Sequence, residues 1–262
     1  MNFHISQLPE RSKKPRSVGL TMVMDKGLSL RETEDFIDGN HPYVDLVKLG
    51  FGSSMITPRL EEKLALYEKA GIPLYFGGTL LEAYLIRDSF DAYMKIIEKF
   101  GVKYAEISDG SITIPHEEKC SLIKRMKKQV TVISEVGSKE EGIIIHPNRW
   151  IEMMQKELEA GVWKVIAEAR ESGNVGIYRP NGKAHVMLIN KIVSKVPVEN
   201  IIWEAPIKSQ QAYLIKLFGA NVNLGNIAPT EVISLETLRL GLRSDTFFQF
   251  LDNQGNEIAV VS

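Results

Sequence analysis

The chain has 262 residues, of which 44% are hydrophobic and 25% charged, and its formal net charge is −1. This is the composition of an ordinary folded protein, and the charge gives no reason to expect a nucleic acid or an anionic membrane as partner. The single cysteine, Cys120, rules out a disulfide within the chain and fits a reducing compartment. No signal peptide and no run of transmembrane length is recognisable, so we expect a cytoplasmic protein.

The first 17 residues contain a short basic run, Arg11 to Arg16 (RSKKPR). We interpret this run as a solvated N-terminal arm, because chain ends are poorly ordered unless something holds them. Contact with a phosphate group or with a partner is the alternative. Residues 18–250 are expected to form one catalytic domain, and residues 251–262 a C-terminal tail.

Eight apolar runs rich in Val and Ile follow the arm, with amphipathic windows between them. They show little alternation of polar and apolar residues, as expected for strands that are buried on both faces. Their spacing averages about 29 residues, the length of a β-α-β repeat. The predicted strands are Val18–Met24, Val44–Leu49, Pro73–Phe76, Tyr104–Ile107, Val130–Ile133, Val162–Ala167, Asn200–Trp203 and Asn221–Leu224.

Three of the predicted helices end at a glycine, and a new strand begins within about three residues of it. These helices are Arg59–Ala70, Ser89–Phe100 and Pro147–Ala160, which end before Gly71, Gly101 and Gly161. Such short connections make successive strands parallel and place the helices outside them. Eight units of this kind predict an α/β protein with a single-domain (β/α)8 TIM barrel; an open doubly wound sheet is the rival architecture.

Four of the predicted strands end at or near a glutamate: Glu106, Glu135, Glu168 and Glu204. A carboxylate beside a buried run costs stability unless a cation or hydrogen bonds compensate it. Acids from four successive strands meet on one axis only in a closed ring, which favours the barrel. We therefore predict that these glutamates hold a divalent metal, and Mg²⁺ suits such hard oxygen ligands. The alternative is that each glutamate is a structural ion-pair partner.

Cations and small polar residues occupy other strand ends. Lys48 in the second strand, Arg170 after the sixth and Lys208 after the seventh could neutralise phosphate or carboxylate groups of a small anionic substrate. A buried pair between Lys48 and Asp45 is the structural alternative. Glycine-rich turns can present N–H groups to a phosphate. The remaining substrate-binding candidates are Ser53, Gly78, Asn223, Gly225 and Asn226.

Several of these motifs are long and unusual. They are Val47-Lys-Leu-Gly-Phe-Gly-Ser-Ser54, Ile133-Ser-Glu-Val-Gly-Ser-Lys139, Glu168-Ala-Arg-Glu-Ser-Gly173 and Trp203-Glu-Ala-Pro206. Together they resemble the phosphosulfolactate synthase family, and the resemblance extends over residues 18–250. It implies a (β/α)8 barrel and a Mg²⁺-dependent addition of sulfite to phosphoenolpyruvate, which gives (2R)-phospho-3-sulfolactate.

The resemblance also implies roles for particular residues. It makes Lys139 the general acid that protonates the enediolate intermediate. We add Arg170 and Lys48 as further catalytic candidates, which would hold an anionic group of the substrate. It suggests a homo-oligomer. Two positions depart from the family pattern: Ser138 stands where many members have a second lysine, and Phe51 stands where we expect a tryptophan.

Two other functions stay open at this point. The family includes plant relatives linked to heat tolerance, so the chain could be a non-catalytic, heat-stress-related barrel protein. It could also be another Mg²⁺-dependent enzyme that acts on an enolisable phosphorylated acid.

Overall fold

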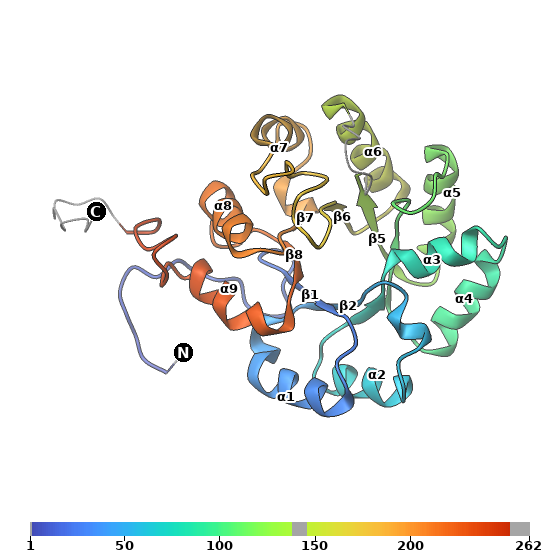
Figure 1. Ribbon diagram of the computed structural model, residues 1–262, viewed down its shortest axis with the longest axis horizontal. Coiled ribbons are helices and arrows are strands. Elements are labelled where there is room, and N and C mark those ends of the chain that lie inside the picture. Colours follow the sequence, from blue (N-terminus) through green and yellow to red (C-terminus); the bar gives the residue numbers. More distant parts are fainter. Residues whose placement is uncertain (1, 138–145, 252–262) are drawn as a thin grey trace.

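Eight strands lie within residues 2–137 and 146–251, which this computed structural model describes. They are β1 (Thr21–Asp25), β2 (Leu46–Leu49), β3 (Leu74–Phe76), β4 (Tyr104–Ile107), β5 (Thr131–Val136), β6 (Lys164–Ala167), β7 (Ile201–Glu204) and β8 (Leu224–Ile227). All their pairings are parallel, in the order β3-β2-β1-β8-β7-β6-β5-β4. Because β3 and β4 also contact each other, the sheet is a nearly closed barrel (Figure 1). The predicted (β/α)8 barrel is confirmed, and the open sheet is excluded.

The helices of the described residues form a ring outside the strands (Figure 1). They are α1 (Leu30–Asn40), α2 (Leu60–Lys69), α3 (Gly78–Leu85), α4 (Phe90–Lys99), α5 (His116–Met126), α6 (Pro147–Ala160), α7 (Val186–Val193), α8 (Lys208–Phe218) and α9 (Val232–Arg239). None of them combines the length and the apolar character that a bilayer crossing requires. The three helices predicted to end before a glycine are confirmed as α2, α4 and α6.

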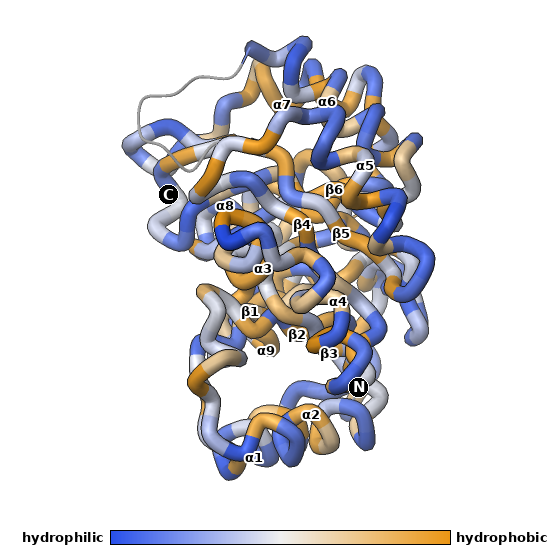
Figure 2. The backbone as a smooth tube through the Cα atoms, turned by 90° about the vertical axis from the view of Figure 1, so that its right-hand side faces the viewer, coloured by the Kyte–Doolittle hydropathy of each residue, from blue (hydrophilic) through white to orange (hydrophobic). Residues whose placement is uncertain are grey.

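The strands carry the hydrophobic core. Every residue of β1, β2, β3, β6, β7 and β8 is buried. Figure 2 shows hydrophobic segments gathered in the strands and polar segments on the outside, in helices as well as loops. The strands show no alternation of polar and apolar residues because one face of each strand fills the barrel and the other packs against the helices.

Strand β8 begins and ends three residues later than predicted, at Leu224 and Ile227. Asn223 therefore lies at the N-terminal end of the barrel, where its side chain accepts a hydrogen bond from the Leu20 N–H at 3.1 Å. Gly225, which the sequence suggested as part of a turn, lies within the strand. A Cβ there would come within 2.7 Å of Met22 and 2.9 Å of Ile202, so close packing inside the barrel requires glycine.

The basic run near the start of the chain is bound to the N-terminal end of the barrel. Arg11 pairs with Glu236 at 2.8 Å and Arg16 with Asp45 at 3.0 Å, and both arginine side chains are at most 10% exposed. The interpretation of this run as a solvated arm is therefore wrong for the two arginines, whereas Lys13 and Lys14 are exposed. Carboxylates and backbone carbonyls at this end of the barrel attract the cations, a tertiary effect that the local sequence does not reveal.

Arg239, the last residue of α9, is completely buried at the same end of the barrel. Its guanidinium donates to the carbonyls of Ala220 and Val222 at 2.7 Å each, and to the carbonyl of Leu20 at 3.0 Å. These carbonyls precede β8 and β1, so Arg239 joins two neighbouring strands and the final helix.

We predict that Arg239→Met destabilises the protein by about 3 kcal/mol or more, because each hydrogen bond from a charged donor contributes about 1.5–3 kcal/mol. Urea unfolding followed by circular dichroism measures the loss. Lys156→Met is the control, since Lys156 forms an exposed pair with Glu152 on the surface of α6, and its unfolding midpoint should not change. Equal midpoints for the two variants would contradict the role given to Arg239.

Candidate functional site

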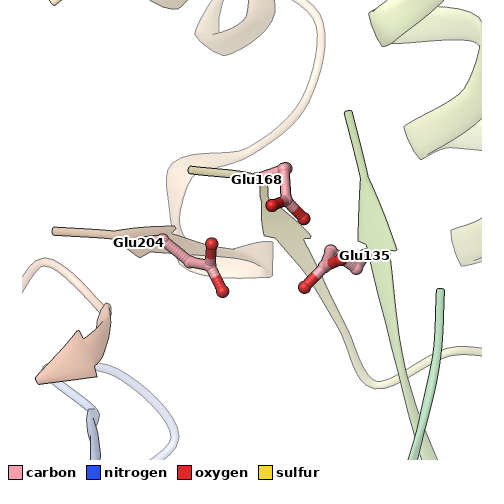
Figure 3. Close-up of side chains that lie close together, drawn as sticks. All are labelled: Glu135, Glu168 and Glu204. Atoms are coloured by element: carbon pink, nitrogen blue, oxygen red, sulfur yellow. The ribbon is translucent and has the colours of Figure 1, made fainter. Parts of the chain in front are cut away.

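Three glutamates from consecutive strands direct their carboxylates toward one another at the C-terminal mouth of the barrel (Figure 3). Glu135 lies in β5, Glu168 directly follows β6, and Glu204 ends β7. All three are buried. One carboxylate oxygen from each residue lies within 4.8 Å of one carboxylate oxygen from each of the other two. These three residues, called the acidic triad below, could hold a metal ion.

The ammonium group of Lys48, in β2, contacts carboxylates from three strands. Its Nζ lies 2.9 Å from Glu106 Oε1, 3.4 Å from Glu135 Oε2 and 3.8 Å from Glu204 Oε1. Burial alone lowers the pKa of Lys48, but the three carboxylates together outweigh this effect and hold its pKa well above the usual value. Lys48 therefore stays charged. The buried pair with Asp45 is not formed, because Asp45 binds Arg16 at the other end of the barrel.

Backbone N–H groups hold two of the glutamates. The Gly78 N–H donates to Glu106 Oε1 at 2.7 Å, and the Ala169 N–H donates to Glu204 Oε2 at 2.7 Å. The other oxygen of Glu204 has no hydrogen-bond partner in the part of the chain that the structure describes. Burial, followed by the charge of Glu135, raises the pKa of Glu204 to about 8. The surroundings of Glu204 therefore favour its neutral, protonated form over its charged form.

Two glycines let the backbone pass close to Glu168. Gly137 and Gly176 have φ angles of +151° and +75°, and a Cβ on either would collide with Glu168, on its side chain and its carbonyl group respectively. The Ile177 N–H donates to the same carbonyl at 3.0 Å. The segment after β6 thus folds back against Glu168 and fixes its backbone at the barrel mouth.

A cavity of about 410 Å³ opens beside the acidic triad. Arg170 brings a cation to its wall, and Lys48 lies at its base among the carboxylates. Asn226 also lines it, with a φ of +55° and an amide oxygen that has no partner among the described residues. The remaining described lining residues are Met24, Phe51, Thr79, Ser111, Ala169, Glu171 and Ser172.

The structure brings together part of the predicted site. Glu135, Glu168, Glu204, Lys48, Arg170 and Asn226 share this cavity. Glu106 lies next to Lys48 but outside the acidic triad, and Gly78 uses its N–H to hold Glu106. Ser53 lies in the turn after β2 and is not among the residues that line the cavity.

Other candidates lie elsewhere. Lys208 begins α8 and pairs with Asp245 at 2.7 Å, and it is not among the residues that line the cavity. Asn223 lies at the opposite end of the barrel, and Gly225 is packed inside β8. Lys139 and Ser138 lie outside the described residues.

Sequence reasoning missed the contributions of Met24 and Ser111 to the cavity wall. Ser111 follows β4 in an Asp-Gly-Ser turn, five residues after Glu106, and that turn was a usable signal. Met24 is a buried strand residue and gave none. Phe51, noted as a departure from the family pattern, does line the cavity, with a φ of +55°.

A parallel eight-stranded barrel with helices outside it places the chain among the (β/α)8 barrels, and its polar cavity lies at the C-terminal mouth, where enzymes of this fold carry their active sites. Solved structures agree on the fold. 3-Hexulose-6-phosphate synthase from Salmonella typhimurium superposes with a TM-score of 0.56 at 13% identity, covering 86% of this chain and all of that one. The YdjI aldolase from Escherichia coli K12 gives 0.53 at 13% identity, covering 89% and 91%.

Sequence comparison identifies the family within this class. Residues 9–245 match the family of (2R)-phospho-3-sulfolactate synthase (ComA). Phosphosulfolactate synthase of Bacillus subtilis (strain 168) is 40% identical over 251 residues, covering 95% of this chain and 100% of that protein. Phosphosulfolactate synthase of Methanothermobacter thermautotrophicus (strain Delta H) is 41% identical over 252 residues, covering 94% and 98%. The chain therefore belongs to the (2R)-phospho-3-sulfolactate synthase family of enzymes, as its motifs predicted.

We predict that Lys48→Met destabilises the protein in EDTA by about 3–5 kcal/mol, because the change leaves buried carboxylates without their shared cation. Urea unfolding at pH 7 measures the difference. Lys26→Met is the matched control: Lys26 pairs with Glu171 at the same mouth, but both side chains are about half exposed, so the midpoint should barely move. If Lys48→Met were as stable as the control, Lys48 would not be the cation that holds the carboxylates together.

Proposed function

We propose that this protein catalyses the Mg²⁺-dependent addition of sulfite to phosphoenolpyruvate, which gives (2R)-phospho-3-sulfolactate. Family membership supports the reaction, and the acidic triad at the barrel mouth is the observation that supports the metal. The reaction forms a carbon–sulfur bond, which makes the protein a carbon–sulfur lyase in the reverse sense. A cytoplasmic location and a homo-oligomeric assembly are parts of the same proposal.

The residues present fit a Mg²⁺ ion. Carboxylate oxygens are its preferred protein ligands, and one oxygen from each of the three glutamates lies within 4.8 Å of the others. Glu204 also offers a buried oxygen without a hydrogen-bond partner in the described chain. Glu135, Glu168 and Glu204 would hold the ion, and Glu106 would stay with Lys48. When bound, Mg²⁺ supplies positive charge that stabilises the negative charge developing on the substrate carboxylate.

The chain's own residues account for the binding of an anionic substrate. In the reaction, sulfite sulfur bonds to the terminal methylene carbon, the carbon–carbon double bond opens, and charge develops on the carboxylate as an enediolate. Arg170 on the cavity wall is the cation suited to a phosphate or carboxylate group. Asn226 presents an amide at the same wall. Its φ of +55° lies in the left-handed region, which asparagine adopts more readily than most residues.

The enediolate needs a proton at C2 to become the product. Lys48 is poorly suited to supply it, because the surrounding carboxylates hold its pKa well above the usual value. Its role is to hold the glutamates and to offset their charge. Lys139 is the proposed donor, on the strength of the Glu-Val-Gly-Ser-Lys motif that begins in β5. It comes two residues after Gly137, which packs against Glu168.

The metal requirement is tested by direct detection of the sulfonated product from sulfite and phosphoenolpyruvate. We expect product with Mg²⁺, loss of product in EDTA, and recovery when Mg²⁺ is restored. Glu168→Gln should lower turnover at a fixed Mg²⁺ concentration by at least 10-fold, whereas Glu152→Gln, an exposed acid on α6, should not change it. Consumption of phosphoenolpyruvate without sulfite would favour another enzyme of enolisable phosphorylated acids. No product under any condition would favour a non-catalytic barrel protein.

Lys139→Ala should lower kcat by about 10²- to 10⁴-fold, the usual contribution of a general acid. Binding of phosphoenolpyruvate, measured by calorimetry, should be largely kept. Lys128→Ala, in the exposed turn that follows α5, is the control and should behave as wild type. Near-normal turnover of Lys139→Ala would remove the proposed role of this lysine.

A further inference from the structure

A second group of buried charges lies outside the cavity, between α5, α6 and the ends of β4 and β5. Lys119 and Glu157 are completely buried, and their side chains pair at 3.1 Å. His116 contacts the same Glu157 oxygen at 3.1 Å, and Asp109 pairs with Lys119 at 2.9 Å. None of these four residues is among those that line the cavity. The proposed reaction gives them no role.

The contacts of Lys119 reach the acidic triad through the backbone. Besides Asp109 and Glu157, its ammonium donates to the carbonyl oxygen of Glu135 at 2.7 Å. An ammonium has three protons, so these three contacts use its full donor capacity. Lys119 is therefore a fixed structural donor and has no proton left for a ligand.

The Glu135 carbonyl needs such a donor because of where β4 stops. The carbonyls of Val132 and Val136 bond to the β6 side of β5, so the carbonyl of Glu135 points to the β4 side. Strand β4 ends at Ile107, which lies opposite Ser134. The strand therefore stops one residue before the position opposite Glu135. Lys119 fills the place of the missing strand donor, which would otherwise leave a buried carbonyl unpaired.

Lys119 also fixes the turn after β4. It binds Asp109, while the buried carboxylate of Glu82 accepts from the N–H groups of Ser111 at 2.7 Å and Gly110 at 3.3 Å on the other side. Ser111 lines the cavity. One buried lysine thus connects the end of β5, which carries Glu135, with the turn that forms part of the cavity wall.

We propose that Lys119 is a positioning residue that holds Glu135 in the orientation the acidic triad needs to bind a divalent ion. The inference rests on the metal site of the proposed function. It predicts that loss of Lys119 weakens metal binding although Lys119 touches neither the ion nor the substrate. Residues that orient metal ligands contribute about 10- to 100-fold to metal affinity.

The test is the affinity of the purified protein for Mn²⁺ alone, measured by calorimetry without substrates. Lys119→Met keeps the length of the side chain and removes the charge, and we expect its Mn²⁺ dissociation constant to rise at least 10-fold. The weaker metal binding should also lower the turnover of Lys119→Met, and a higher Mg²⁺ concentration should restore much of that turnover. Lys164→Met is the matched control: Lys164 is also buried and donates to a backbone carbonyl, that of Glu199, at 2.6 Å at the other end of the barrel. This control should bind Mn²⁺ within about twofold of wild type.

Lys119→Met leaves Glu157 buried without its cation, which can prevent folding. The double variant Lys119→Met/Glu157→Gln removes both charges, and we expect it to fold while still binding Mn²⁺ at least 10-fold more weakly. Wild-type affinity in either folded variant would overturn the role of Lys119 and leave the proposed function intact. A wild-type protein that binds no Mn²⁺ would overturn the metal site, and this inference with it.

Discussion

Buried negative charge at the barrel mouth is the constraint on which the rest of the structure depends. Carboxylates removed from water are tolerated only where positive charge or hydrogen bonds surround them. Lys48 contacts three of the glutamates, and backbone N–H groups donate to two of these. Replacing buried ion pairs by well-packed apolar residues is often neutral or stabilising in proteins, so stability alone does not explain why the charges are present. We interpret the charge as retained for function.

The barrel supplies what this arrangement needs. Parallel strands end at one rim, so residues at the ends of β5, β6 and β7 converge although they are far apart in the sequence. Close approach at Gly137 and Gly176 fixes the backbone around Glu168. Lys119 donates the hydrogen bond to the Glu135 carbonyl that β4, which ends before Glu135, does not supply. The acids are thus held by backbone contacts as well as by the charge of Lys48.

Much of the fold could be predicted from the sequence, because its signals are local. Val- and Ile-rich runs, glycine stops and the spacing of the units indicate eight strands and their helices. The glutamates of the triad were predictable for the same reason: Glu168 and Glu204 follow an apolar run directly, and Glu135 follows one after a single serine. Asn223 and Gly225 were misplaced because Asn-Leu-Gly-Asn has the composition of a turn, whereas packing against Met22 and Ile202 makes Gly225 part of a strand.

Contacts between distant segments could not be predicted. Arg11 and Arg16 read as solvated because their partners, Glu236 and Asp45, are remote in the sequence. Lys119 lies in a charged helical stretch that gives no hint of complete burial or of a contact with the Glu135 carbonyl. The separation of Glu106 from the acidic triad likewise depends on the position of the Lys48 ammonium. Such features follow from tertiary packing.

The most direct test of the account is a crystal structure of the protein grown with Mn²⁺, with the ion located by anomalous scattering. The account predicts one strong peak between the carboxylates of Glu135, Glu168 and Glu204, about 2.0–2.3 Å from an oxygen of each, as hard divalent ions require. No peak at the barrel mouth, or a peak bound elsewhere while these three carboxylates stay apart, would contradict it.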